Sequence, residues 1–390
     1  MKEVYIVSTK RSPIGGFLGS LSSVSATKLG AHAIKNTYES IQMDPAWIDS
    51  VYMGNVLSAD LGQSPARQAA IFAGIPVDKD ASTINKVCAS GMKATMLGAQ
   101  QIQMGLEHIV VTGGMESMSN VPHYTHIRQA VKYGDVRMID GVTKDGLWDV
   151  YNGFHMGSAA ELAVNRYGLS RQMQDEFAIM SYERAQTATK DNKFRNEVAL
   201  VSIPSKQGVI EVEADEDIYK IIPDKVSKLK PAFEKDGTIT AANASNLNDG
   251  AAACILASKE AVDRYGLKPL AKIIGYADAA QAPEWFTTSP SLAIPKALHG
   301  AGLTVNDIDY FEINEAYAAV VLANQQILGY QLDRVNVYGG AVAMGHPIGA
   351  SGARILTTLV SVLKQEGGNY GVAAICNGGG GASAIIIQNI

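Results

Sequence analysis

The chain has 390 residues, of which 47% are hydrophobic and 18% are charged, and its formal net charge is −5. This length is enough for a sizeable core and for two or three domains, and the negative charge argues against a dedicated nucleic-acid-binding protein. Three cysteines cannot form a disulfide framework in so long a chain, so they indicate a reducing compartment. No CxxC or HxxxH pair supplies the spacing of metal ligands, and we therefore expect no metal site.

Neither end of the chain shows a targeting segment. The start, "MKEVYIVSTKRSP", enters a strand-like run at Val4 almost at once, and the end, "IIIQNI", is also strand-like. The longest apolar runs, such as "AYAAVVLA", are too short to cross a bilayer. We therefore expect a soluble, cytoplasmic protein that binds neither nucleic acid nor membrane.

From Val4 to about Met118, short apolar runs alternate with longer helical patterns. The runs that predict strands are Val4–Val7, Val51–Met53, Thr83–Val87 and His108–Thr112. Helices are predicted over "ATKLGAHAIKNTYES" and "GMKATMLGAQQIQMG". The strands lack polar alternation, which is typical of a sheet covered on both faces. The predicted fold class is therefore a layered α/β fold.

The segment from about Asn120 to Asn248 has a different character. A long polar helix is predicted near Arg171–Asn192, and the acidic run "EVEADED" follows it. This mixture is typical of a long excursion that carries binding loops. After Asp249 the layered pattern resumes with "GAAACILAS", "LAKIIGYA", "YFEIN", "VNVYGG" and "GVAAICN".

Two segments share one order of features. "VCASGMKATMLGAQQIQMGLEHIVVTGG" and "GASGARILTTLVSVLKQEGGNYGVAAICNGG" each run from Ala-Ser-Gly through a helix and a glycine-containing turn to an apolar strand and Gly-Gly. We interpret this as an internal duplication with a site between two similar halves, although two α/β units could be alike by chance. The predicted domains are residues 1–119 completed by about 249–268, an inserted loop domain over 120–248, and a second half over 269–390.

Cys88 lies in "TINKVCASGMKA", between a predicted strand and a helix that starts near Ser90. The amides and dipole of a helix N-terminus favour a thiolate, and Ala89 and Gly91 leave room for a substrate. Cysteine is also among the most buried residue types, so this segment alone does not decide whether Cys88 reacts or packs. Cys254, inside "AAACILA", is predicted to pack.

Three further segments place polar residues at predicted junctions. His346, in "GGAVAMGHPIGASG", lies in a stretch too rich in glycine for a regular helix, where an imidazole could act as general base or oxyanion donor. Cys376 ends an apolar strand before "NGGGGAS", where the N–H of Gly378 could help form an oxyanion hole. A phosphate loop fits that run less well, because no GxxxxGK[ST] is present. Asn314, in "EINEAYAA", would by itself most often cap a helix.

Together these elements resemble those of the thiolase family, in order and over essentially the whole chain. The segments that carry the resemblance are "RSPIGGFLGSL", "NKVCASGMKA", "GGMESMSN", "NASNLNDGAA", "NEAYAA", "GGAVAMGHPIGASGAR" and "CNGGGGAS". The segment "YNGFHMG" is similar to the biosynthetic, short-chain branch of the family. The resemblance implies a thiolase fold of two similar βαβαβαββ halves, layered α-β-α-β-α, with an inserted loop domain, and it implies a homotetramer built as a dimer of dimers.

The activity that the resemblance implies is the reversible Claisen condensation of two acetyl-CoA molecules to acetoacetyl-CoA and CoA, with no metal or redox cofactor. Cys88 would carry the acetyl group, and His346 would take the thiol proton. His346 and a water held by Asn314 would form one oxyanion site, and Cys376 would remove the α-proton of the second acetyl-CoA. The N–H groups of Cys88 and Gly378 would stabilise the oxyanion of the acylated intermediate.

Contacts with coenzyme A are also implied by the resemblance. The residues that would line its pantetheine tunnel are His155, Met156, Leu229, Phe233, Ser245, Ala316 and Tyr317. Tyr317 stands where many thiolases have phenylalanine, and a phenol there needs a hydrogen-bond partner if it is buried. The lysines of "KVSKLK" could attract the CoA phosphates or could form a solvated face.

Three other activities are weighed against this one. A degradative 3-ketoacyl-CoA thiolase of broader chain length shares all the catalytic residues and is the main alternative. A ketosynthase acting on carrier protein is expected to have an "AHGT"-like segment where this chain has "NEAYA". A catalytically silent lipid-binding protein of the same fold is disfavoured because all four candidate catalytic side chains are present.

Overall fold

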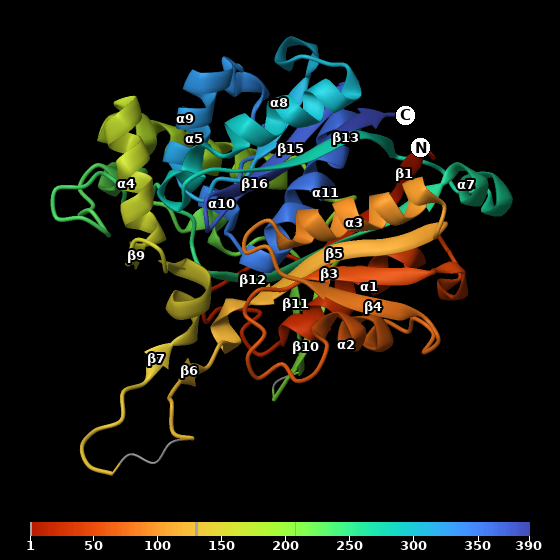
Figure 1. Cartoon of the computed structure of the whole chain (residues 1–390), viewed down its shortest axis with the longest axis horizontal. Helices are drawn as coiled ribbons and strands as arrows, with labels where there is room; N and C mark the ends of the chain where they lie inside the picture. Colours follow the sequence, from red (N-terminus) through yellow and green to blue (C-terminus); the bar gives the residue numbers. More distant parts are fainter. Residues whose placement is uncertain (1, 129–131, 207) are drawn as a thin grey trace.

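The computed structural model describes residues 2–128, 132–206 and 208–390 (Figure 1). Its centre is a ten-stranded sheet in the order β14-β15-β16-β13-β1-β12-β5-β3-β4, with β2 (Gly15–Gly16) paired to β12. The other strands of this sheet are β1 (Val4–Arg11), β3 (Ser50–Gly54), β4 (Asp80–Ile84), β5 (Ile109–Ser117), β12 (Asn248–Ser258), β13 (Ala271–Ala280), β14 (Tyr310–Ile313), β15 (Tyr370–Asn377) and β16 (Gly381–Asn389).

Helices cover both faces of this sheet. They are α1 (Ala26–Ser40), α2 (Pro65–Phe72), α3 (Ser90–Met104), α4 (Met156–Tyr167), α5 (Arg171–Lys190), α6 (Pro223–Val226), α7 (Lys259–Tyr265), α8 (Pro290–Ala301), α9 (Ala318–Leu328), α10 (Ala341–Met344) and α11 (Ile348–Glu366). Helices α1 and α2 pack on one side of the first half of the sheet, and α8 packs on the second half. Helices α3 and α11 contact each other and strands of both halves, so they form the central layer (Figure 1). Buried apolar side chains fill the spaces between these layers, and the layered α/β prediction is confirmed.

The two halves of the sheet repeat one topology. In the first half, β3 pairs in parallel with β4 and β5, and β12 pairs antiparallel with β5 and β1. In the second half, β14 pairs in parallel with β15, and β16 pairs antiparallel with β15 and β13. The two halves join into one sheet where β1 pairs antiparallel with β13, with Val4 opposite Ile273. This repetition agrees with the duplication inferred from the sequence.

Two predicted strands differ in the structure. The run "VNVYGG" contributes only a parallel bridge between Val335 and Phe311, because Asn336 takes a left-handed φ of +48° and its side-chain amide hydrogen-bonds both the N–H and the C=O of Ile313. The strand predicted to reach Val87 ends at Ile84, because Val87 also has a φ of +48°. Residues 85–87 therefore form a turn before Cys88.

The segment between the halves carries small two-stranded elements and two helices. The pairs are β6 (His123–Tyr124) with β7 (Ile139–Asp140), β8 (Trp148–Asp149) with β9 (Phe154–His155), and β10 (Val201–Ser205) with β11 (Gly208–Val212). The strands β6 and β7 lie on an arm that extends from the body of the molecule (Figure 1). The predicted helix near Arg171–Asn192 is observed as α5, whose N-cap Ser170 accepts a hydrogen bond from the N–H of Met173. The three-part division by residue number stays a prediction.

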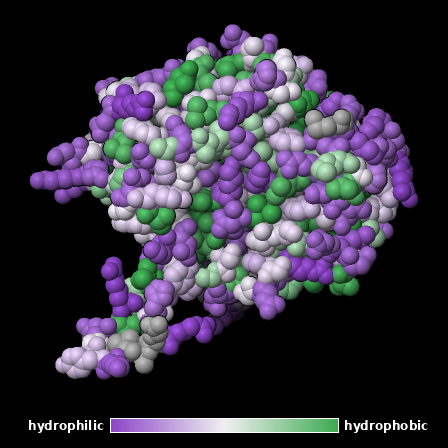
Figure 2. Space-filling view, in the orientation of Figure 1, coloured by the Kyte–Doolittle hydropathy of each residue, from purple (hydrophilic) through white to green (hydrophobic). Residues whose placement is uncertain are grey.

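The surface is mixed in character. In the face shown in Figure 2, hydrophilic side chains are interspersed with hydrophobic ones. Within the described ranges, no helix has both the length and the apolar composition needed to cross a membrane. Those ranges also hold no group of three or more Cys, His, Asp or Glu side chains that could bind a metal ion.

Candidate active site

A cavity of about 370 Å³ brings together most of the residues predicted from the sequence. Those on its wall are Cys88, His155, Met156, Phe233, Ser245, Ala316, Tyr317, His346 and Gly378. Asn314 and Cys376 are buried next to this wall, since Asn314 contacts His346 and Cys376 lies close enough to Cys88 for ionisation of one thiol to disfavour ionisation of the other. Leu229 is not part of the wall, and it remains 37% exposed. The contact of Leu229 with CoA that the resemblance implies stays a prediction.

Three hydrogen bonds that involve side chains help to close the turn before Cys88. The N–H of Val87 donates to Oδ1 of Asn85 at 3.0 Å, and the Ser90 hydroxyl donates to the carbonyl of Val87 at 2.5 Å while accepting from the N–H of Lys86 at 2.8 Å. A left-handed conformation is unfavourable for a β-branched residue such as Val87. The surrounding contacts therefore hold this turn in a strained shape that presents Cys88 at the start of α3.

An ion-pair network ties this turn to the other half of the molecule. Asp278, on β13, binds Nζ of Lys86 at 2.5 Å and Nζ of Lys93 at 2.7 Å, and it accepts from the hydroxyl of Ser383 at 2.6 Å. Burial acts to raise the pKa of Asp278, but these hydrogen bonds outweigh it and lower the pKa to about 2. Asp278 is therefore ionised at neutral pH, and it joins the Cys88 turn and α3 to β13 and β16.

Cys88 is uncharged in the substrate-free site. Its side chain still contacts the cavity, but protein atoms surround it, and burial raises its pKa to about 12. The N–H groups of Gly378 and of Cys88 itself point at the sulfur and act in the opposite direction, while the carboxylate of Glu116 adds to the increase. The backbone amides do favour the thiolate, as expected from the sequence, but burial has the larger effect in the substrate-free site.

His346 lies in the loop between α10 and α11 and is held from both sides. Its N–H donates to Oδ1 of Asn248 at 2.9 Å, and its ring Nδ1 lies 2.6 Å from the hydroxyl of Ser351. Its Nε2 lies 3.4 Å from the amide nitrogen of Asn314. Burial, and then the charge of Arg354, lower the pKa of His346 to about 3. The imidazole is therefore neutral and can accept a proton.

Gly345 is required for this arrangement. Its φ is +107°, and a Cβ at this position would lie 2.2 Å from Cγ of Asn248, the side chain that holds His346. The glycine-rich sequence around His346 is therefore explained by close packing in the site.

Cys376 and Asn314 come from the second half. Cys376 lies near the end of β15, where burial and then the charge of Cys88 raise its pKa. Asn314 does not cap a helix, because α9 begins only at Ala318 with Tyr317 in the cap position. Gly378 follows β15 in the turn to β16, and its Cα faces the side chains of Val87 and Met156. Thus two thiols, an imidazole and an amide converge from the two halves.

Aromatic side chains form another part of the cavity wall. The rings of His155 and Phe233 stack with their centroids 4.8 Å apart, and Phe233 meets Tyr317 edge-on at 6.0 Å. Both the N–H and the hydroxyl of Ser245 donate to the carbonyl of Ala316. Burial, and then the charges of both active-site cysteines, raise the pKa of Tyr317. Its hydroxyl has no hydrogen-bond partner among the residues that the structure describes, so the polar end of this ring is free to face a ligand in the cavity.

Three residues of the site had no role in the sequence interpretation. Asn248 and Ser351 hold His346, and Glu116 accepts hydrogen bonds from the N–H groups of Val56, Leu57 and Gly349. All three lie in segments that carry the thiolase resemblance. The Glu116–Gly349 bond spans 233 positions of the chain, so neither periodicity nor local spacing could have revealed it.

The fold and this site define a class of protein that comparison with known sequences also supports. The pattern of the thiolase N-terminal domain matches residues 4–260 and that of the thiolase C-terminal domain matches residues 267–389. The chain therefore belongs to the thiolase family.

Individual relatives are similar over their full length. The chain is 54% identical to the cytosolic acetyl-CoA acetyltransferase of Gibberella zeae over 99% of this chain and 98% of that protein. It is 53% identical to the acetyl-CoA acetyltransferase of Schizosaccharomyces pombe over 100% and 99% of the two chains. A mitochondrial acetyl-CoA acetyltransferase of Gibberella zeae is 51% identical over 100% of this chain and 91% of its own.

A solved structure gives the same fold. The crystal structure of the thiolase Acat5 from Ascaris suum in complex with coenzyme A superposes with a TM-score of 0.95, with 47% identity over 100% of both chains. The predicted thiolase fold is confirmed.

Proposed function

We propose that this chain is an acetyl-CoA acetyltransferase, an acyltransferase that condenses two acetyl-CoA molecules to acetoacetyl-CoA and CoA. The observation that carries the proposal is the convergence, at one cavity, of Cys88, His346 and Gly378 with Cys376 and Asn314 next to them. Relatives that bear this name at 51–54% identity support the same activity.

The first step is acylation of Cys88. Its sulfur attacks the carbonyl carbon of acetyl-CoA, and the thiol proton passes to Nε2 of His346, which is neutral and open to the cavity. The tetrahedral oxyanion accepts hydrogen bonds from donors in the site, each typically worth about 3 kcal/mol to a transition state. The C–S bond to CoA then breaks, and CoA leaves as a thiol with the proton from His346. The acetyl group remains on Cys88 as a thioester.

The second step forms the new carbon–carbon bond. The Cys376 thiol first gives its proton to Nε2 of His346. The resulting thiolate takes an α-proton from a second acetyl-CoA, while the protonated Nε2 of His346 and a water held by Asn314 donate hydrogen bonds to the thioester oxygen. The enolate carbon attacks the carbonyl of acetyl-Cys88, whose oxyanion is held by the N–H groups of Cys88 and Gly378, the two amides that point at this sulfur. Acetoacetyl-CoA leaves, and the Cys88 thiolate takes the proton held on Nε2 of His346, which restores both thiols and the neutral imidazole.

The reaction, as proposed, uses CoA thioesters alone, without a metal or a redox cofactor. We further propose a cytoplasmic homotetramer, as the resemblance to thiolases implies; the 54% identical relative named cytosolic favours that compartment. The main alternative is a degradative thiolase that accepts longer 3-ketoacyl-CoA chains. The names of the relatives, all acetyl-CoA acetyltransferases at 51–54% identity, favour the short-chain activity.

Intact-protein mass spectrometry after brief exposure to acetyl-CoA, followed by peptide mapping, tests the proposal. We expect one acetyl group on Cys88 in the wild type and none in Cys88→Ala. Cys376→Ala should still be acetylated but should form no acetoacetyl-CoA. CoA binding without any acetylation would contradict the proposal. Thiolysis rates with 3-ketoacyl-CoA substrates of increasing chain length would separate the two thiolase activities.

A further inference from the structure

One wall of the cavity is made by a chain segment with little regular structure. Residues 227–247 follow the short helix α6 and contain no further helix or strand. Ala232, Phe233, Thr240, Ala241 and Ser245 from this segment line the cavity. Because such a segment has few backbone hydrogen bonds of its own, its shape depends on contacts made by its neighbours.

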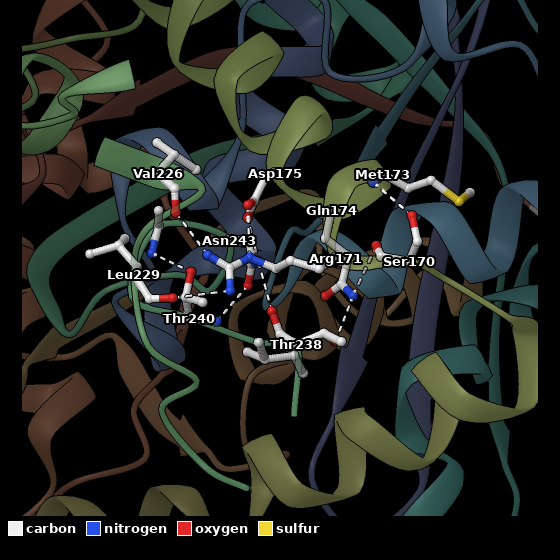
Figure 3. Close-up of polar contacts among 12 residues, drawn as sticks. Ser170, Arg171, Met173, Gln174, Asp175, Val226, Leu229, Thr238, Thr240 and Asn243 are labelled. Atoms are coloured by element: carbon white, nitrogen blue, oxygen red, sulfur yellow. Dashed lines mark hydrogen bonds and ion pairs between the residues drawn. The ribbon is translucent and has the colours of Figure 1, made fainter. Parts of the chain in front are cut away.

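Arg171, the first residue of α5, supplies such contacts from outside the cavity. Its Nη2 donates to the carbonyl of Val226 at 2.7 Å and its Nη1 donates to the carbonyl of Leu229 at 3.1 Å (Figure 3). Its Nε donates to Oδ2 of Asp175, one helical turn later, at 2.7 Å. The planar guanidinium thus holds two carbonyls and a carboxylate in one fixed fork, a geometry that lysine cannot reproduce.

The network continues from Asp175 into the cavity wall. Oδ1 of Asp175 accepts from the amide of Asn243 at 2.9 Å, and Oδ1 of Asn243 accepts from the N–H of Thr240 at 2.8 Å (Figure 3). The carbonyl of Asn243 accepts from the N–H of Ala318 at 2.8 Å, at the start of α9 and next to Tyr317. Asp175 and Asn243 are buried, and neither they nor Arg171 line the cavity.

We propose that Arg171 is a positioning residue for the CoA thioester, acting through Asp175 and Asn243 on the cavity wall; this rests on the function proposed above. Among the described residues, the hydrogen bonds of Arg171 go to its own helix, to α6 and to the segment that carries Phe233 and Thr240, and not to Cys88, His346 or Cys376. It therefore contributes to binding of the CoA portion and not to the chemistry on the acetyl group. Preorganising this wall lowers the entropy lost when the long thioester binds.

The test compares two thioesters in Arg171→Gln. Acetyl-CoA is long enough to contact the whole wall formed by residues 227–247. S-acetyl-N-acetylcysteamine keeps the reacting acetyl group but lacks the nucleotide. We expect KM for acetyl-CoA and Kd for CoA to rise about ten-fold, because the lost contacts lie outside the cavity and only part of their stabilisation is passed on to the bound thioester. The acetylation rate constant of Cys88 with the truncated thioester should stay within about two-fold of wild type.

Arg184→Gln is the matched control. Arg184 lies on the same helix and also donates to two backbone carbonyls, those of Leu332 and Val335, in a loop that does not line the cavity. It should change the midpoint of unfolding without changing KM or Kd. If Arg171→Gln does not fold, Arg171→Lys, which keeps the charge and loses the fork, should raise KM and Kd in the same direction.

Three results would overturn the proposal: unchanged KM and Kd in the Arg171 variants, an equal loss of rate with both thioesters, or an equal rise of KM in Arg184→Gln. If the wild-type protein binds CoA but is never acetylated, the function proposed above is contradicted. In that case weaker CoA binding by Arg171→Gln alone would still support the role of Arg171 in holding the wall.

Discussion

The ring Nδ1 of His346 lies 2.6 Å from the hydroxyl of Ser351, and that hydroxyl donates its one hydrogen to the carbonyl of Pro347 at 3.0 Å. Ser351 must then accept a hydrogen bond from Nδ1–H, which leaves the lone pair of the imidazole on Nε2, facing Asn314 and the cavity. The Ser351 side chain thus assigns the tautomer that a general base requires.

Ser351→Ala is expected to lower kcat about ten-fold, because one hydrogen bond that orients a catalytic base is worth about 1–1.5 kcal/mol. KM for acetyl-CoA should stay unchanged, since Ser351 does not line the cavity. Steady-state kinetics of condensation measures both. Ser361→Ala, a buried serine on the same helix, is the control and should leave kcat at the wild-type value. Equal kcat in both variants would mean that Ser351 does not set the tautomer.

Val87 offers a test of strain at the nucleophile. Val87→Gly removes about 1 kcal/mol of left-handed strain, but glycine also makes the unfolded chain more flexible by a similar amount. The free energy of unfolding should therefore stay within about 1 kcal/mol of wild type. In contrast, kcat should fall ten-fold or more, because the flexible turn no longer holds the Cys88 sulfur at a fixed position relative to the N–H of Gly378. Denaturant unfolding and kinetics of one protein preparation give both numbers.

Gln42 provides the comparison for Val87. It is an exposed residue with a φ of +53° just after α1, far in sequence from any residue of the site. Gln42→Gly should change stability as little as Val87→Gly and leave kcat unchanged. A wild-type kcat in Val87→Gly would show that the strained turn has no part in catalysis.

The fold class and most of the cavity wall could be predicted from the sequence because they depend on local signals. The apolar strands predicted a layered α/β fold. The candidate catalytic residues Cys88, His346 and Cys376 could be recognised because each lies beside small residues at the end of a helix or strand. Contacts between side chains far apart in the chain could not be predicted, because no local pattern indicates them. The ion pair of Asp278 with Lys86, for example, spans 192 positions. The hydrogen bond from Arg171 to the carbonyl of Leu229 spans 58 positions and was likewise not predicted.

Asp278 is expected to matter to both stability and rate. Asp278→Asn removes the negative charge between Lys86 and Lys93, so the two ammonium groups repel and the Cys88 turn loosens. We expect acetylation of Cys88 to slow several-fold and the free energy of unfolding at neutral pH to fall by about 1 kcal/mol, a small value because the side chain is one-third exposed.

The pH dependence of that stability difference has a definite sign. Because the folded state lowers the pKa of Asp278 from 3.8 to about 2, its contribution is complete above pH 4 and is lost as the pH falls toward 2. Urea unfolding of wild type and Asp278→Asn should therefore differ by a constant amount above pH 4. Glu39→Gln, which removes a surface ion pair with Lys35, should behave as wild type. A difference that grows on acidification would contradict the role of Asp278.

The resting state of Cys88 predicts how it reacts with iodoacetamide. Its pKa is raised to about 12, while that of His346 is lowered to about 3, so neither group titrates between pH 6 and pH 10. Only the thiolate reacts, and its fraction should therefore rise about ten-fold with each pH unit across this range. Alkylation rates followed by peptide mapping should increase without a plateau, and Cys254→Ala, which removes a fully buried thiol, should give the same profile. A plateau below pH 9 would instead indicate that Cys88 and His346 form a thiolate–imidazolium pair at rest, with the proton already transferred before substrate binds.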